Sequence, residues 1–135
     1  EAIRKSELCH SGELCFVVEH GLHFYRILTG TTPRQRALEI FSERRVWDTE
    51  LNNGVLIYLL LADRQIEIVA DRGILKCLPQ SGWDNICLEM EDSFRKSEFE
   101  RGLLSGIEKI TALLTSHFPV SKGDKNELGN RPIVL

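Results

Sequence analysis

The chain has 135 residues, of which 42% are hydrophobic and 27% are charged, and its formal net charge is −3. This length suffices for one domain with a buried core, and the composition excludes a disordered chain. Acidic and basic residues are mixed along the sequence without a basic cluster, so we expect no nucleic-acid partner. No segment is long and apolar enough for a transmembrane helix, and no signal-peptide pattern is present.

The cysteines Cys9, Cys15, Cys77 and Cys87 form no Cys-x-x-Cys pair and have no histidine at zinc-like spacing. We expect them to be reduced, small apolar side chains, which favours a reducing compartment. The sequence begins at Glu1 in the middle of a helix-like pattern, so we expect it to be a fragment. The predicted location is cytoplasmic, and a segment preceding Glu1 could associate the domain with a membrane.

The first predicted elements are a helix end, a strand and a loop. Residues 1–9 are typical of the end of an amphipathic helix, and Gly12 of its stop signal. Residues Glu13–Glu19 then predict a largely buried strand, because apolar side chains fall on both of its faces. Residues 20–31 predict a loop with room for one helical turn.

Thr32 followed by Pro33 predicts a helix start, because threonine caps helices well and proline fits the first helical position. Apolar residues at spacings of three and four extend this helix to Val46, and Arg34 and Arg36 are expected to face water. A strand follows the helix, which makes a βαβ crossover. The two strands that flank the helix should therefore run parallel.

The run Val55–Ala62 has no polar face and predicts a strand that is buried on both faces at the centre of a covered sheet. Residues Gln65–Asp71 alternate between apolar and polar and predict a half-exposed strand. Only Asp63-Arg64 separates the two runs. We therefore expect a tight antiparallel hairpin.

Two amphipathic helices should follow a loop at residues 74–80. Capping-box patterns predict that the first helix starts at Ser81 and the second at Ser97. Residues 1–118 therefore predict one three-layer α/β/α sandwich, with a small mixed sheet made of a βαβ unit and a hairpin. Residues 119–135 predict an extended tail pinned by its last apolar side chains.

Strand direction should gather polar side chains at one edge of this sheet. The starts of two parallel strands share that edge with the end of the antiparallel third strand. Carboxylate and amide oxygens are the ligands that Ca²⁺ and Mg²⁺ prefer. The predicted cation ligands at this edge are Asp48, Glu50, Asn52, Asn53 and Asp71, with His10, Glu13 and Arg72 as additional candidates.

The alternative is that these residues lie in solvated loops, where they cap helices and pair with Arg44, Arg45 and Arg72. For any single residue this alternative is the simpler one, and only the convergence of the whole set favours a site. Neither a glycine-rich phosphate loop nor EF-hand spacing is present, so no nucleotide cofactor is expected. Trp47 and Trp83 are expected to pack in the core or at its rim.

The segments at residues 52–62 and 66–74 resemble the core of the TPM domain family. That family is known for an Asn-Gly-Val-Leu strand, here at residues 53–56, and for a following strand that ends at a glycine. Residues 90–95 and 99–107 resemble its final helix pair, and residues 6–13 and 45–50 resemble a compact bacterial branch. The resemblance implies an α/β/α sandwich, in agreement with the predicted elements.

The same resemblance implies several functions. Relatives in the thylakoid lumen are acid phosphatases, others are accessory subunits of membrane proteins, and some bind calcium. The positions that match the family's site lie around Asp48–Asn53 and Asp71. We therefore expect an interaction module that binds Ca²⁺ or Mg²⁺ and acts with a protein partner associated with the membrane.

The alternative function is a metal-assisted acid phosphatase. It would use Asp48 or Asp71 as metal ligand or nucleophile, and Arg72 or Arg45 to hold the phosphoryl charge. We rank binding above catalysis, because a phosphatase site collects several cationic donors and this edge is mainly anionic.

Overall fold

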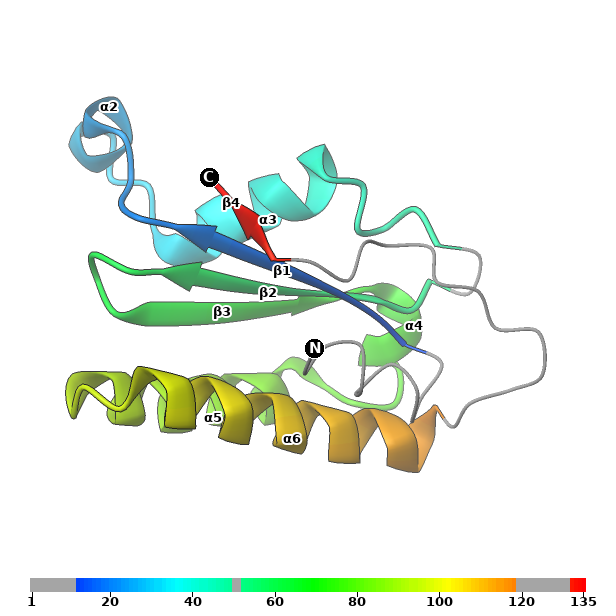
Figure 1. Cartoon of the computed structure of the whole chain (residues 1–135). Coiled ribbons are helices and arrows are strands. Elements are labelled where there is room, and N and C mark those ends of the chain that lie inside the picture. Colours follow the sequence, from blue (N-terminus) through cyan, green and yellow to red (C-terminus); the bar gives the residue numbers. More distant parts are fainter. Residues whose placement is uncertain (1–11, 50–51, 119–131) are drawn as a thin grey trace.

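The computed structural model describes residues 12–49, 52–118 and 132–135 (Figure 1). Its strands are β1 (Glu13–Glu19), β2 (Gly54–Leu60), β3 (Gln65–Ala70) and β4 (Ile133–Val134). Its helices are α2 (Phe24–Leu28), α3 (Pro33–Glu43), α4 (Arg72–Leu75), α5 (Gln80–Arg95) and α6 (Phe99–His117).

The strands form one mixed sheet in the order β3-β2-β1-β4. Strand β1 runs parallel to β2 and β4, and β2 runs antiparallel to β3. Figure 1 shows α3 on one face of the sheet and α5 and α6 on the other. The predicted α/β/α sandwich with a βαβ unit, a hairpin and two C-terminal helices is confirmed.

The core consists of two hydrophobic clusters, one on each face of the sheet. Successive strand residues point to opposite faces. Leu14 and Phe16 of β1 therefore pack towards α5 and α6, whereas Cys15 and Val17 pack towards α3. All of β2 is buried, as expected for a run without a polar face.

Helix α3 begins as the sequence predicts. The Thr32 hydroxyl accepts a hydrogen bond from the Gln35 N–H (3.1 Å), and the Gln35 side chain accepts one from the Thr32 N–H (2.9 Å). Pro33 occupies the first turn of the helix. The helix is shorter than predicted because Arg45 has a φ of 52°, and Val46 is buried beyond the helix end.

The hairpin connection is longer than predicted. Leu61–Arg64 join β2 to β3, rather than Asp63-Arg64 alone. The N–H groups of Leu61 and Ala62 donate to carbonyls at the end of β1 and just beyond it, at 3.0 and 2.8 Å. These two residues therefore bond to the end of β1 and do not pair with β3. Their apolar character alone does not predict this difference.

The capping boxes predicted for α5 and α6 were wrong. Pro79 is the N-cap of α5 and Ser81 lies inside its first turn, so no side chain caps this helix. Glu98 is the N-cap of α6, and Ser97 has a φ of 61° in the turn before it. A capping serine needs an extended backbone at the N-cap position, and neither serine occupies that position.

Helices α5 and α6 pack closely against each other (Figure 1). The rings of Phe94 and Phe99 stack across the connecting turn, with centroids 5.1 Å apart. A Cβ atom on Gly106 of α6 would overlap the side chain of Met90, so this approach requires glycine. Trp83 of α5 is fully buried, and its indole N–H donates to a backbone carbonyl at 3.1 Å.

The last residues of the chain join the sheet. Strand β4 pairs with β1 in a register that places Ile133 opposite Val17. The Leu135 N–H donates to the Val18 carbonyl at 2.7 Å. The apolar end of the predicted tail therefore extends the sheet beside β1.

Side chains cover the outer edge of β3. Arg34 Nη1 and Gln80 Nε2 both donate to the Ile68 carbonyl, at 2.8 and 3.2 Å. The Ile66 N–H donates to Glu91 Oε1 at 3.3 Å. Arg34 is thus half-buried and bonded, so the prediction that it faces water was wrong.

Candidate functional site

Three of the predicted site residues lie at the edge where β1 and β2 begin and β3 ends. The Glu13 N–H donates to the Asn53 carbonyl at 3.0 Å, and the Asp71 N–H donates to the Gly54 carbonyl at 2.8 Å. The parallel pairing of β1 with β2 and the antiparallel pairing of β2 with β3 produce this arrangement. We call this region the polar edge.

The polar edge is buried, with exposed fractions of 5% for Glu13, 4% for Asn53 and 9% for Asp71. Asp71 is the N-cap of α4, and its Oδ1 accepts a hydrogen bond from the Arg72 N–H at 2.7 Å. Its other oxygen, Oδ2, is buried and has no hydrogen-bond partner among the residues that the structure describes. A buried polar atom of this kind is costly unless something occupies the space beside it.

The loop before β2 is joined to the polar edge by hydrogen bonds. The Thr49 hydroxyl accepts from the Asn53 N–H at 3.0 Å, and the Thr49 carbonyl accepts from the Asn52 N–H at 3.3 Å. Asn52 has a φ of 52°, a conformation that asparagine tolerates better than most residues. Its carbonyl accepts from the Gly73 N–H at 3.0 Å, which connects the loop to α4.

The other predicted residues lie at the rim or outside the described chain. Asp48 and Arg72 are exposed, whereas Glu50 and His10 fall outside the described residues. Within residues 12–49, 52–118 and 132–135, no group of three or more His, Cys, Asp or Glu side chains is arranged to hold a metal. Among the described predicted ligands, Asp71 Oδ2 is a side-chain oxygen that is buried without a described hydrogen-bond partner, and oxygen atoms of this kind are the ligands that hard cations prefer.

Two parts of this region, helix α4 and the role of Thr49, are not predicted from the sequence. Residues 74–80 were predicted as a loop, but Arg72–Leu75 form a helix that Asp71 caps. An aspartate directly after a strand is a possible cap signal, although so short a helix shows no periodicity. The role of Thr49 depends on the folded loop and has no sequence pattern of its own.

A second buried polar cluster, formed by Glu19, Arg36 and Tyr58, lies on the α3 face of the sheet. Arg36 Nε and Nη2 donate to the two carboxylate oxygens of Glu19, at 3.0 and 3.1 Å, and the Tyr58 hydroxyl donates to Glu19 Oε1 at 2.7 Å. Arg36 is 8% exposed, so the prediction that it faces water was wrong. It precedes the buried Ile40 by four residues and shares its helix face.

This cluster keeps its members in fixed charge states. Burial alone would raise the pKa of Glu19, but hydrogen bonds from Arg36 and Tyr58 and the charge of Arg36 together lower it. The hydrogen bond to Glu19 raises the pKa of Arg36, and burial beside the same carboxylate raises the pKa of Tyr58. The cluster is thus a satisfied structural network and not a reactive site.

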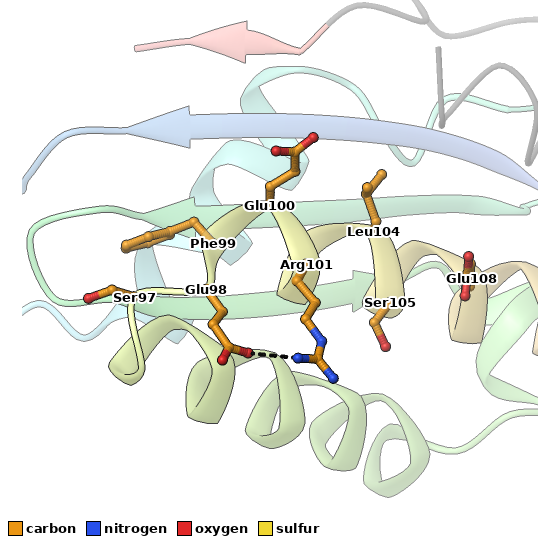
Figure 2. A pocket seen from close by; sticks show the side chains of 8 residues that line it. All are labelled: Ser97, Glu98, Phe99, Glu100, Arg101, Leu104, Ser105 and Glu108. Atoms are coloured by element: carbon orange, nitrogen blue, oxygen red, sulfur yellow. Dashed lines mark hydrogen bonds and ion pairs between the residues drawn. The ribbon is translucent and has the colours of Figure 1, made fainter.

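An open hollow lies beside the start of α6, and it contains none of the predicted site residues. Figure 2 shows its side chains projecting from the helix in different directions, with an ion pair between Glu98 and Arg101 at 3.5 Å. Its polar lining residues are all exposed, so it lacks the converging buried groups typical of catalysis. The lining residues are Ser97, Glu98, Phe99, Glu100, Arg101, Leu104, Ser105 and Glu108.

The three described cysteines differ in exposure. Cys15 and Cys87 are buried, and Cys77 is exposed. Burial raises the pKa of Cys87 to about 12, so this thiol is unreactive near neutral pH. Cys9 lies outside the described residues.

The chain is a small α/β/α domain. Its polar edge lies at the N-terminal ends of β1 and β2, the two longer parallel strands. Residues 1–113 match the TPM domain model, and the chain belongs to the TPM domain family. No curated protein matches the chain. Within the described residues, every helix is too short or too polar to cross a membrane.

Several solved structures resemble this chain, and two of them illustrate the similarity. The NMR structure of the BA42 protein from the psychrophilic bacterium Bizionia argentinensis has a TM-score of 0.83 and 32% sequence identity, over 98% of this chain and 87% of that chain. The solution NMR structure of the N-terminal domain of a P. gingivalis protein has a TM-score of 0.71 and 19% identity, over 87% of this chain and 71% of that one. The second similarity concerns the fold alone.

Proposed function

We propose that this TPM domain is an interaction module that binds a divalent cation, Ca²⁺ or Mg²⁺, at the polar edge and acts with a membrane-associated protein partner. The observation that carries the proposal is the buried Asp71 Oδ2, which has no hydrogen-bond donor among the described residues. A carboxylate oxygen removed from water without a donor is destabilising, and a bound cation offsets this cost.

The chemistry of the neighbouring groups suits a hard cation. Ca²⁺ is bound by carboxylate oxygens, amide and backbone carbonyl oxygens, and water. Asp71 and Asn53 would hold the ion from the buried side, and Glu13 lies next to them at the start of β1. Asp48 would add a ligand from the loop, and Glu50 is a further candidate from the sequence. The ion would supply positive charge to a region that otherwise collects carboxylates.

The rim of the polar edge offers a surface for a partner. Trp47 precedes Asp48 in the loop and is 48% exposed, while its indole N–H donates to the Ser42 carbonyl at 3.3 Å. A large aromatic side chain held in one orientation is typical of protein interfaces. Because Trp47 directly precedes Asp48, a partner that contacts its ring would lie next to the proposed cation site.

Calcium titration followed by amide NMR tests the cation site. We expect the signals of Asn53, Asp71 and Gly73 to shift together in the wild type at millimolar calcium, and Asp71→Asn to weaken binding at least tenfold. Asparagine also caps helices, so this variant should keep α4 and its stability. Asp63→Asn, in the exposed turn at the far end of the hairpin, is the matched control and should bind as the wild type does.

Three results would overturn the cation proposal. They are a spectrum that calcium leaves unmoved, a response spread evenly over the acidic surface, and equal weakening by Asp71→Asn and Asp63→Asn. Magnesium in place of calcium determines which ion the site prefers, since Mg²⁺ demands a stricter geometry.

The alternative proposal, a metal-assisted acid phosphatase, uses the same edge. Exposure of Asp48 and Arg72 at its rim favours it, because substrate could reach a carboxylate and a guanidinium there. We expect wild type and Asp48→Asn to release phosphate from a generic phosphomonoester at the same background rate, with calcium or magnesium present. A loss of more than about tenfold in the variant would favour the phosphatase instead.

A further inference from the structure

Helix α2 carries large apolar side chains that the body of the domain does not cover. Phe24, Tyr25, Ile27 and Leu28 are 75%, 58%, 62% and 70% exposed, and the helix has no buried residue. The other exposed large apolar side chains of the described chain are separated from one another along the sequence, and single exposed apolar side chains are ordinary for a protein surface. The four on α2 are neighbours, and a contiguous apolar patch is typical of an interaction site.

The structure holds α2 by its polar residue and leaves its apolar residues outside. Arg26 Nη1 lies 2.6 Å from Glu39 Oε2 of α3, and Glu39 also contacts Arg36 at 3.3 Å. Leu22, before the helix, packs against the core. Figure 1 shows α2 projecting beyond the end of the sheet, away from the strand ends that form the polar edge.

The charges of this segment are compatible with an anionic surface. Residues 20–38 contain neither aspartate nor glutamate, although the whole chain has a net charge of −3. Exposed His20 and His23 precede α2, and the Arg26 guanidinium lies 5.4 Å from the centre of the Tyr25 ring. The carboxylate that contacts this segment, Glu39, is paired with both Arg26 and Arg36. The residues of the segment itself therefore add no carboxylate that would repel anionic lipid headgroups.

The size of the patch favours a lipid surface over a second copy of this chain. A stable protein interface buries roughly 800 Å² and about 20–30 residues on each side, far more than one short helix supplies. A bilayer needs no matching shape, and aromatic side chains are enriched at its interface. We propose that α2 inserts its apolar side chains into the interfacial region of a phospholipid bilayer, independently of the cation site.

Vesicle binding tests this proposal. The probe is unilamellar vesicles of phosphatidylcholine and phosphatidylserine, mixed with the whole chain without added metal. We expect the wild type to co-sediment with the vesicles and the double variant Phe24→Ser/Ile27→Ser to bind at least about tenfold more weakly. The substituted side chains are exposed, so the thermal midpoint should stay unchanged. Leu88→Ser on α5, where the leucine is 60% exposed, is the matched control and should bind as the wild type does.

A second measurement separates insertion from adsorption by charge. Phe24→Trp should show a blue-shifted emission component on adding vesicles, beyond any change in the wild type, whereas Leu88→Trp should not. Absence of vesicle binding by the wild type would overturn the proposal, as would equal binding by the double variant and Leu88→Ser. Concentration-dependent dimers that the double variant abolishes, without vesicle binding, would assign the patch to a second copy. Because no metal is added, a negative vesicle result would contradict the lipid proposal and leave the cation proposal to be decided by the calcium titration.

Discussion

Alanine at Gly54 is expected to lower the free energy of unfolding by about 3 kcal/mol or to prevent folding. Gly54 is the first residue of β2, and a Cβ atom there would overlap the carbonyl oxygen of Val46 and lie 3.0 Å from its carbonyl carbon. Neither chain can move away easily. Val46 is fully buried, and Gly54 is paired in register with Glu13 on β1.

Chemical denaturation of Gly54→Ala beside the wild type measures this effect. Gly82→Ala is the matched control, because a Cβ atom there meets nothing within 4 Å and the residue lies in α5. We expect the control to be neutral or to gain up to about 1 kcal/mol from the better helix propensity of alanine. Equal denaturation midpoints for Gly54→Ala and the wild type would contradict the close approach.

Arg36→Met is expected to destabilise the domain by about 3–5 kcal/mol near neutral pH. The substitution removes both donors to the Glu19 carboxylate and leaves a buried charge with only the Tyr58 hydroxyl as a hydrogen-bond partner in the cluster. Arg95→Met is the matched control. Arg95 is exposed and lies 3.8 Å from Asp92, so its loss should cost less than about 1 kcal/mol.

The pH dependence of the Arg36 effect has a definite sign. In the wild type the pKa of Glu19 is below its ordinary value of 4.5, so its stabilisation is complete above that pH and is lost on acidification. In Arg36→Met, burial without the guanidinium should raise the pKa of Glu19. Protonation of Glu19 should therefore remove the buried charge, and reduce the destabilisation of the variant, as the pH falls. The difference in unfolding free energy should therefore shrink from neutral pH through 4.5, and a constant difference would contradict this account.

The sequence predicts those parts of the fold whose signals are local. The capping pair at Thr32 and Pro33 defines the start of α3, and the unbroken apolar run after Gly54 defines β2. The alternation along β3 separates its buried and polar faces. Strand direction then follows from the crossover, which is why Glu13, Asn53 and Asp71 can be assigned to one edge without coordinates.

The features that the sequence does not predict depend on neighbours distant along the chain. Arg36 reads as a solvated helix residue until Glu19 and Tyr58 are placed beside it. The length of the hairpin connection depends on bonds between Leu61 and the end of β1. At the polar edge, the residue types indicate oxygen ligands. The burial of Asp71, and the lack of a described hydrogen-bond partner for its Oδ2, can be seen only in the folded structure.

The bonded outer edge of β3 limits how other proteins can recognise this domain. Many complexes form by β-augmentation, in which a partner contributes a strand to an open sheet. Here such a peptide would have to displace Arg34, Gln80 and Glu91 from the backbone of β3. At the opposite side the sheet ends in β4, whose two residues offer little length for pairing. Partners should therefore bind to loops and helix surfaces. The side chains that cover the edge of β3 also hinder edge-to-edge pairing of the sheets of two copies of the domain.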